Sequence, residues 1–267
     1  MGLGFASGVV SVLERLVFES EAETRARRGA VSQGELERIA EQKPPPRDFA
    51  GALRAPGLSV IAEMKARSPS AGMLCPEYDP KVLAAAFAGG GASALSVLVQ
   101  TESFGGRPEH LWEAHCAADL PVLRKDFVTD EYQVVEARAY GADAVLLIVA
   151  ALGGDRLGAL VELIRAHGME PLVEVHAPDE VDVALETGAS VIGVNHRDLR
   201  TLRVDPTLTD RLRAAIPRDR VLVAESGIAT VEDARHLREA GADAVLVGEA
   251  LLRARDPAQL IRRIAVA

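Results

Sequence analysis

The sequence has few cysteines, few aromatic residues and no excess of positive charge, and each shortage excludes a class of protein. Cys75 and Cys116 show neither Cys-x-x-Cys spacing nor a histidine cluster, so we expect neither a zinc site nor a disulfide framework. The formal net charge is −9, and no lysine- and arginine-rich run or aromatic stripe offsets it. Such a chain repels nucleic-acid backbones and anionic lipids, so we expect neither nucleic acid nor membrane as a partner.

Long hydrophobic runs are also missing. No apolar stretch reaches the length that spans a bilayer. Residues 1–16 lack the basic start and the cleavage pattern of a signal peptide, and Ala6 stands where N-myristoylation needs Ser or Thr. Two free thiols suit a reducing compartment. The sequence therefore predicts a cytoplasmic protein.

What the chain has in quantity is a repeat of short apolar runs and amphipathic stretches. Its 267 residues, 48% of them hydrophobic, can bury one large core. After helices expected near 9–28 and 35–42, runs rich in Val, Ile and Leu predict eight strands, at 58–65, 93–99, 121–125, 143–149, 170–175, 190–195, 221–225 and 243–248. Stretches of helical period follow them, at 79–89, 108–117, 130–140, 154–167, 178–187, 207–215, 230–240 and 256–265.

The joints between these helices and strands repeat one phrase, as GGASALSVL, GADAVLLI, GASVIGV and GADAVLVG. Glycine at such a joint suits a helix C-cap, and the apolar run after it suits a strand buried on both faces. Eight such units predict an α/β fold, a single closed (β/α)8 TIM barrel over residues 51–267. A doubly wound sheet is the main alternative, but it would show a GxGxxG turn after the first strand, and none is present.

Residues 1–50 are expected to form a helical extension. Leu13, Leu16 and Val17 recur at helical spacing there. This stripe suits packing on the barrel better than binding of a partner.

Polar residues stand late in the predicted strands. In a TIM barrel the C-terminal ends of the strands meet at one mouth, where active sites lie. A single charge at a strand end reads most simply as a solvated rim residue. Several polar strand ends meeting at one mouth instead predict an active site. It is formed by the strand-end residues Glu63, Lys65, Lys125, Glu174, Asn195, Arg197 and Glu225.

The loops after the seventh and eighth strands carry Ser226, Gly227 and Gly248. These residues suit ordinary turns, but barrels of this type bind phosphate there with glycine-freed backbone N–H groups, and we favour phosphate. The segment 68–70, Ser-Pro-Ser, is either a proline turn or a lid over the substrate. His176 and His196 have no partner at triad or metal-ligand spacing, so we interpret both as structural or exposed and expect no metal site.

These residues belong to longer motifs: VIAEMKARSPSAG, PVLRKDFVTDEYQVVEARAYGADAVLLIVAAL, LVEVH, IGVNHRDLRTL, VAESGI and LVGEALL. In order and spacing, over nearly the whole chain, they resemble the indole-3-glycerol-phosphate synthases of tryptophan biosynthesis. The resemblance implies a lyase that converts 1-(2-carboxyphenylamino)-1-deoxyribulose 5-phosphate to indole-3-glycerol phosphate, with loss of carbon dioxide and water. It further implies a phosphorylated small-molecule substrate, no cofactor, and a monomer or weak homodimer.

The resemblance also implies roles for individual residues. Lys125 corresponds to a general acid that protonates the ketose oxygen. Lys65 contacts the substrate anion and takes part in dehydration, Glu63 and Glu174 are acid/base carboxylates, and Asn195 polarises the pocket. The implied substrate- and phosphate-binding residues are Ser68, Pro69, Phe127, Arg197, Ser226, Gly227, Gly248 and Glu249.

Three positions depart from the family pattern. Val99 and Gln100 stand where the family commonly has Thr and an acidic residue, and Ala250 stands where a serine is frequent. These departures leave open a paralogue that acts on a ring-substituted substrate. Another phosphate-binding barrel enzyme and a non-catalytic ligand-binding descendant are further alternatives. Because the sequence ends after the eighth helix, no fused isomerase or amidotransferase domain is expected.

Overall fold

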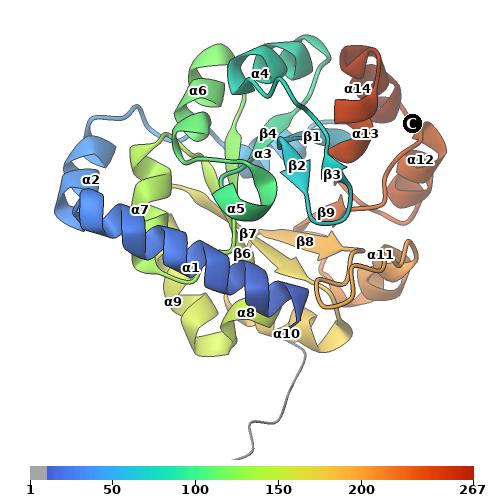
Figure 1. Cartoon of the computed structure of the whole chain (residues 1–267). Helices are drawn as coiled ribbons and strands as arrows, with labels where there is room; N and C mark the ends of the chain where they lie inside the picture. Colours follow the sequence, from blue (N-terminus) through green and yellow to red (C-terminus); the bar gives the residue numbers. More distant parts are fainter. Residues whose placement is uncertain (1–10) are drawn as a thin grey trace, which may run out of the picture.

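A computed structural model describes residues 11–267, so the beginning of the helix predicted from residue 9 lies outside the described residues. Eight parallel strands close into a barrel in the order β1-β10-β9-β8-β7-β6-β5-β4 (Figure 1). The predicted TIM barrel and its eight strands are confirmed. The barrel strands are β1 (Ser59–Met64), β4 (Ala94–Leu98), β5 (Val122–Lys125), β6 (Ala144–Ile148), β7 (Glu170–Val175), β8 (Val191–Asn195), β9 (Val221–Glu225) and β10 (Ala244–Val247).

Helices cover the outside of the barrel (Figure 1). They are α4 (Pro80–Gly89), α6 (Glu109–Ala117), α7 (Glu131–Ala139), α9 (Gly154–Ala166), α10 (Pro178–Glu186), α11 (Leu208–Leu212), α12 (Val231–Glu239) and α14 (Pro257–Ala265). The stretch predicted as one helix at 207–215 is an α-helix that ends in a 3-10 turn, Arg213–Ala215. Within residues 11–267, no helix has both the length and the apolar character needed to cross a membrane.

Several short elements were not predicted. They are α3 (Phe49–Leu53), α5 (Thr101–Phe104), α8 (Val149–Leu152), α13 (Glu249–Arg253) and an antiparallel hairpin of β2 (Arg67–Ser68) and β3 (Gly72–Met73). Elements of two to five residues are too short to show a hydrophobic period. The hairpin contains the Ser-Pro-Ser segment, whose Ser68 hydroxyl accepts a hydrogen bond from the Ala71 N–H at 3.1 Å.

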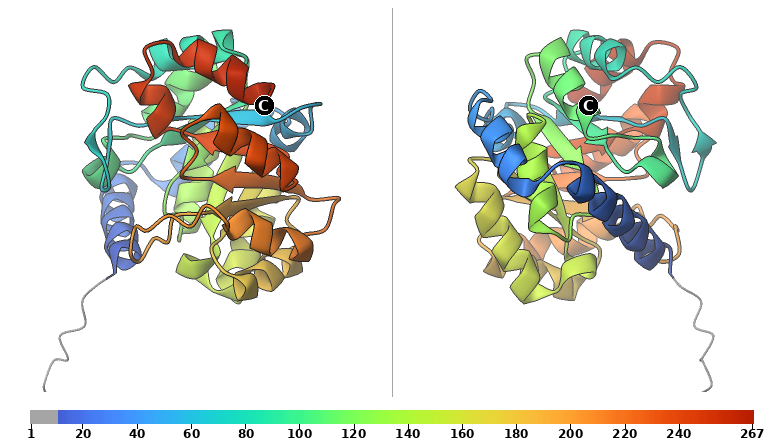
Figure 2. Two further views of the ribbon diagram at one scale, coloured as in Figure 1. Left: turned by 90° about the vertical axis from the view of Figure 1, so that its right-hand side faces the viewer. Right: turned by 60° about the vertical axis from the view of Figure 1, so that its left-hand side comes forward.

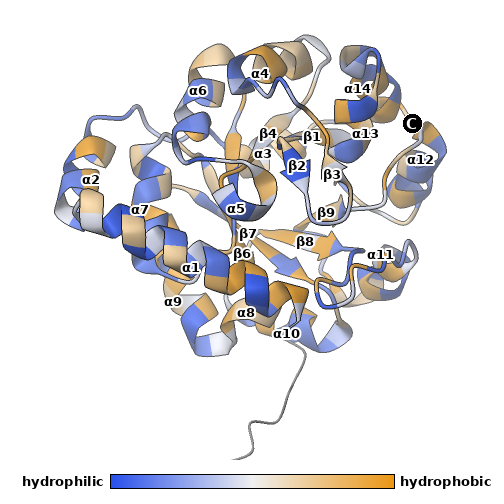
Figure 3. Ribbon diagram, viewed as in Figure 1, coloured by the Kyte–Doolittle hydropathy of each residue, from blue (hydrophilic) through white to orange (hydrophobic). Residues whose placement is uncertain are grey.

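The alternation of side chains along the strands separates two cores. Val60, Ala62 and Met64 point outward into the layer between strands and helices. Ile61 points inward, together with residues such as Leu123 and Val223. Figure 3 shows the strands as mostly hydrophobic, as expected of a sheet buried on both faces.

The repeated glycine joints adopt the conformation that the sequence predicted. Gly141 and Gly241 have φ angles of +77° and +95°, which a glycine adopts without strain. Two residues later in the same phrase, Asp143 accepts a hydrogen bond from the Val122 N–H at 2.7 Å, and Asp243 accepts one from the Leu222 N–H at 2.8 Å. Each aspartate therefore links the start of one strand to the start of its neighbour, at the N-terminal end of the barrel.

The N-terminal helices lie against the barrel (Figure 2). Helix α1 (Val12–Ala30) begins with a capping box between Ser11 and Glu14, and its Leu13 and Leu16 join the inner core cluster. Helix α2 (Gln33–Glu41) packs on α7, where Leu36 contacts the cluster around Tyr132. The apolar stripe of α1 therefore packs on the barrel.

Candidate active site

A cavity of about 430 Å³ opens at the C-terminal end of the barrel, and every residue that the sequence predicted for the site lines it. The cavity also includes residues that were not predicted for the site. Leu16 comes from α1, Phe104 from α5 and Arg253 from α13. The N-terminal helix is therefore part of the cavity wall.

The charged residues of the site form the uppermost inward layer of the barrel. Glu174 follows Leu172 by two residues on β7, and Glu225 follows Val223 by two on β9, so each continues an apolar inward row. Strand β8 contributes Gly193 to the layer below. A Cβ at that position would clash with the Glu225 carboxylate, so glycine makes room for this buried side chain.

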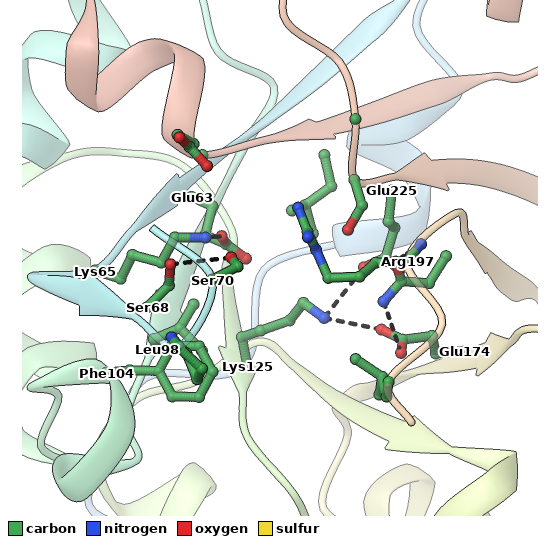
Figure 4. Close-up of a pocket in the computed structure, with 18 of the residues that line it drawn as sticks. Glu63, Lys65, Ser68, Ser70, Leu98, Phe104, Lys125, Glu174, Arg197 and Glu225 are labelled. Carbon is green, nitrogen blue, oxygen red and sulfur yellow. Dashed lines mark hydrogen bonds and ion pairs between the residues drawn. The ribbon is translucent and has the colours of Figure 1, made fainter. Parts of the chain in front are cut away.

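Lys125 lies at the centre of the site, between two carboxylates (Figure 4). Its Nζ is 2.8 Å from Glu174 Oε2 and 3.1 Å from Glu225 Oε2. Burial disfavours the ammonium, but the attraction of Glu174 and Glu225 outweighs burial and holds the pKa of Lys125 above its ordinary value. Lys125 therefore carries a proton throughout the neutral range.

The two carboxylates differ in the support they receive. Glu174 also accepts a hydrogen bond from Asn195 Nδ2 at 3.0 Å. Burial opposes its ionisation, but Lys125 and His176 outweigh burial and hold the pKa of Glu174 well below its ordinary value. Neither oxygen of Glu225 accepts a well-directed hydrogen bond from residues 11–267. Burial and the nearby Glu174 raise the pKa of Glu225 in spite of Lys125, so Glu225 is the carboxylate that holds a proton most readily.

Glu225 was expected at the mouth of the barrel as a polar strand end, but no chemical role was assigned to it from the sequence. It was visible only as a polar strand end in VAESG, and nothing local distinguishes it from a rim residue. Its exposed fraction is 1%, which excludes a rim position. The pairing with Lys125 joins residues 100 positions apart in the chain, so it emerges only when the barrel closes.

Glu63 and Lys65 form a second ion pair, beside Gly248 (Figure 4). The two side chains lie on the same face of the chain, as the alternation of β1 predicted. A Cβ at Gly248 would lie 2.5 Å from Glu63 Oε1 and 3.2 Å from Lys65 Nζ. Gly248 therefore leaves the space that this ion pair occupies.

The loop after β9 has an unusual backbone. Ser226 has a φ of +68° and is followed by Gly227 at +77°. The left-handed region costs a residue other than glycine about 1 to 3 kcal/mol, and such residues cluster at functional sites. Ser226, Gly227, Gly248 and Glu249 line the cavity together, and Glu249 pairs with Arg253 at 2.9 Å.

Part of the cavity wall is apolar. Phe104 and Phe127 lie with ring centroids 6.2 Å apart and planes tilted by 32°, and Leu98, Leu146 and Ile148 complete this wall. Such a wall suits a flat aromatic ring. The cavity thus places an apolar slot beside a cluster of charged acid/base groups.

The departure at Gln100 has a structural role. The Gln100 side chain accepts a hydrogen bond from the Ser103 N–H at 2.9 Å and donates one to Glu19 of α1 at 2.9 Å. Glu23 accepts hydrogen bonds from the N–H groups of Thr101 and Glu102. Gln100 therefore fixes α5, which carries Phe104, to the N-terminal helix.

The two histidines near strand ends are both largely buried. His196 lies between the Ser226 carbonyl and the Thr209 hydroxyl, at 3.0 and 2.7 Å. His176 lies 3.2 Å from Glu174 Oε1. No group of three or more His, Cys, Asp and Glu side chains in the described chain has an arrangement that could hold a metal ion.

The chain is similar to known proteins in sequence and in fold. The family model described as indole-3-glycerol phosphate synthase matches residues 13–264. Indole-3-glycerol phosphate synthase 2 of Streptomyces coelicolor is 59% identical over 94% of this chain and 97% of its own length. An indole-3-glycerol phosphate synthase of a Roseiflexus species is 46% identical over 95% and 98%.

A solved structure of thiamine phosphate pyrophosphorylase from Pyrococcus furiosus superimposes with a TM-score of 0.57. The match covers 78% of this chain and 93% of that one, at 18% identity. At this identity the likeness concerns the fold alone.

Proposed function

The chain belongs to the indole-3-glycerol phosphate synthase family, and on this premise we propose how its residues close the pyrrole ring of 1-(2-carboxyphenylamino)-1-deoxyribulose 5-phosphate. The observation that carries the proposal is the position of Lys125 between Glu174 and Glu225, inside a cavity that also has an apolar wall. The reaction needs an acid beside a ketose oxygen and a slot for an aromatic ring. This cavity has both.

Binding uses both sides of the cavity. The aromatic ring packs against Phe104 and Phe127, which supply an apolar surface. The phosphate lies at the far side, where Ser226, Gly227, Gly248 and Glu249 line the wall, and Lys65 contacts a substrate anion. Ser68 and Pro69 of the hairpin and Arg197 after β8 enclose the ribulose portion.

Ring closure begins when the aromatic carbon that bears the carboxylate attacks the ketose carbon. The new carbon–carbon bond turns the carbonyl oxygen into an alkoxide, and Lys125 donates a proton to it. The high pKa of Lys125 does not prevent this transfer, because an alkoxide is a stronger base than an amine. The bond to the carboxylate then breaks, carbon dioxide leaves, and the electron pair restores the aromatic ring.

Dehydration completes the pyrrole. The new hydroxyl leaves as water with a proton from an acid, and a base removes a proton from the neighbouring carbon. Glu225, whose raised pKa leaves it protonated more readily than Glu174, and Lys65 with Glu63 are the groups positioned for these transfers. The ionised Glu174, and Glu63 in its ion pair with Lys65, stabilise the cationic nitrogen that develops, and Asn195 orients Glu174.

A continuous fluorescence assay for the indole product tests the proposal with the purified chain. Turnover is expected for the wild type and a loss of at least about 1,000-fold in kcat for Lys125→Ala, because the central acid is gone. Lys81→Ala serves as the matched control, since Lys81 is exposed on α4 and lies outside the cavity. A fully active Lys125→Ala enzyme would remove Lys125 from the role assigned here.

The alternatives predict other outcomes. A paralogue for ring-substituted substrates would show a higher kcat/KM with a substituted ring than with the plain one. A non-catalytic descendant would bind substrate tightly without turnover. Another phosphate-binding barrel enzyme would show no turnover of the carboxyphenylamino substrate.

We also propose a cytoplasmic location and a monomer that at most dimerises weakly. Cys75 and Cys116 are free thiols, which persist in reducing compartments. Fractionation of cells and light scattering of the purified chain test the two statements separately.

A further inference from the structure

His176 lies between a carboxylate of the site and one behind it. It follows the end of β7, and its side chain is 11% exposed. The ring Nε2 is 3.2 Å from Glu174 Oε1, and Nδ1 is 3.6 Å from Glu180 Oε2 on α10. The backbone N–H of His176 also donates a hydrogen bond to Glu180 Oε2 at 2.6 Å, which fixes Glu180 behind the ring.

His176 makes the two carboxylates around Lys125 unequal. Glu174 accepts hydrogen bonds from Lys125 and Asn195, and the imidazole Nε2 lies 3.2 Å from its Oε1 as an ion-pair partner without a well-directed hydrogen bond. Glu225 has Lys125 beside it, and neither of its oxygens accepts a well-directed hydrogen bond from the described residues. When two such carboxylates share one cation, the better supported one ionises first and the proton stays on the other.

The charges around His176 favour its protonated form. Glu174 faces it from β7 and Glu180 from α10, and the Asp198 carboxylate lies in the loop after β8. Burial lowers the pKa of His176, but Glu174 and Glu180 outweigh burial and raise this pKa to about 10. The other charged or titratable residues lining the adjoining cavity are Asp179, His196, Arg200, Arg203, Asp205 and Arg211.

We propose that His176 is a positioning residue for the reaction: as an imidazolium it keeps Glu174 ionised, so that the proton shared by the carboxylates around Lys125 resides on Glu225. His176 lines the adjoining cavity and not the active-site cavity, so it acts through Glu174 and does not touch substrate. The inference rests on the roles proposed above for Lys125, Glu174 and Glu225.

The first test is the pH profile of kcat for His176→Asn, measured by indole fluorescence. Loss of a cation beside Glu174 makes the carboxylate pair hold its proton more tightly. The alkaline limb of the profile is therefore expected to move up by about one pH unit or more, with KM changed less than about twofold. His167→Asn is the matched control, because His167 ends α9 and lines neither cavity.

Glu180→Gln is the second variant. It keeps the imidazole but removes the outer carboxylate that favours its charge, so a smaller shift in the same direction is expected. A His176→Asn enzyme whose kcat is lower at every pH but whose limb is unmoved would show that His176 has only a structural role, and would overturn the inference.

The second test uses the wild-type chain, so it depends neither on the folding of a variant nor on turnover. Nitrogen-15 NMR of the histidine rings in the wild-type chain at pH 8 should show one ring with both nitrogens protonated, assigned to His176 by selective labelling. A neutral His176 ring at pH 8 would overturn the inference. A chain without turnover but with a charged His176 would instead contradict the proposed function.

Discussion

Replacement of Gly248 by alanine is expected to reduce activity without unfolding the barrel. Gly248 has φ −121° and ψ −74°, outside the left-handed region, so its backbone does not demand glycine. The constraint is space, because the added Cβ would lie 2.5 Å from Glu63 Oε1. Non-bonded heavy atoms rest at about 3.5 Å, so the Glu63 carboxylate must retreat by about 1 Å.

That displacement sets the size of the effect. A reacting group misplaced by about 1 Å costs about 100-fold in rate, or about 2.7 kcal/mol in the activation free energy. Lys65 Nζ would lie 3.2 Å from the new methyl group and would move with its partner. The barrel loses little stability, because the largest shifts fall on the ends of the Glu63 and Lys65 side chains in a cavity, and Glu63 Cβ, 3.2 Å from the new methyl group, must give by only a few tenths of an ångström. The free energy of unfolding is therefore expected to change by less than about 1 kcal/mol.

The indole fluorescence assay and urea unfolding measure the two quantities on the same preparation. Gly158→Ala is the matched control. Gly158 lies inside α9 with no atom within 4 Å of its added Cβ, so the control is expected to gain about 0.5 to 1 kcal/mol of stability and keep full activity. Normal kcat/KM in Gly248→Ala would refute the reasoning, as would a loss of activity that only follows a loss of stability.

Three further predictions concern the core, the pH dependence and the apolar wall. Arg124→Met should lower the free energy of unfolding by about 3 to 5 kcal/mol in urea titrations, because it leaves Asp126 buried without its cation and leaves Glu136 with Arg27 alone; a loss below 1 kcal/mol would contradict this. The folded state holds a proton on His176 up to about pH 10, and the unfolded chain loses it near pH 6.5, so the folded state binds more protons in that window. The free energy of unfolding should therefore fall by up to about 1.4 kcal/mol per pH unit between pH 7 and 9, and the raised pKa of Glu225 acts in the same direction; stability that rises over this window would be inconsistent with a charged His176. Phe104→Ala should raise KM about tenfold or more by removing one face of the aromatic slot, and an unchanged KM would place the ring elsewhere.

The predictable parts of the fold are those that a local sequence pattern marks. The run from Val60 to Met64 is apolar except at Glu63, and its flanking residues bound a strand, so β1 could be located within one residue of its ends. The alternation of eight apolar runs with eight helical stretches indicated the number of units, and the repeated glycine joints marked four of the connections. Because barrel strands deliver their ends to one mouth, the position of Glu174 late in its run was enough to place it in the cavity.

The parts that were not predictable depend on residues far apart in the chain. Helix α5 has four residues, and Glu19 and Glu23 of α1 supply its hydrogen bonds, so no local signal marks it. His176 is a different case, because its partners Glu174 and Glu180 are near it in the chain. In the sequence it is a lone histidine after LVEV, and its place between the two carboxylates follows from the turn that leads from β7 into α10.

Two adjacent cations on β5 show why residue type alone could not distinguish a structural residue from a residue with a chemical role. Arg124 and Lys125 are neighbours, and strand alternation sends them to opposite faces of the barrel wall. Arg124 is fully buried on the outer side, paired with Asp126 and with Glu136, which also binds Arg27 of α1. Of its two carboxylate partners, Asp126 lines the active-site cavity and Glu136 does not. Through Glu136 this cation holds α1 and α7 to the strand that presents Lys125.

Lys125 faces inward, where its carboxylate partners Glu174 and Glu225 line a cavity that can admit substrate. Its charge is matched almost as closely as that of Arg124, yet Lys125 has an open side and Arg124 has none. The chemical role follows from that open side, which no spacing rule in the sequence specifies. The two neighbouring cations of β5 therefore have different roles: Arg124 is a structural anchor and Lys125 is a candidate acid. Arg124 fixes the position of Lys125.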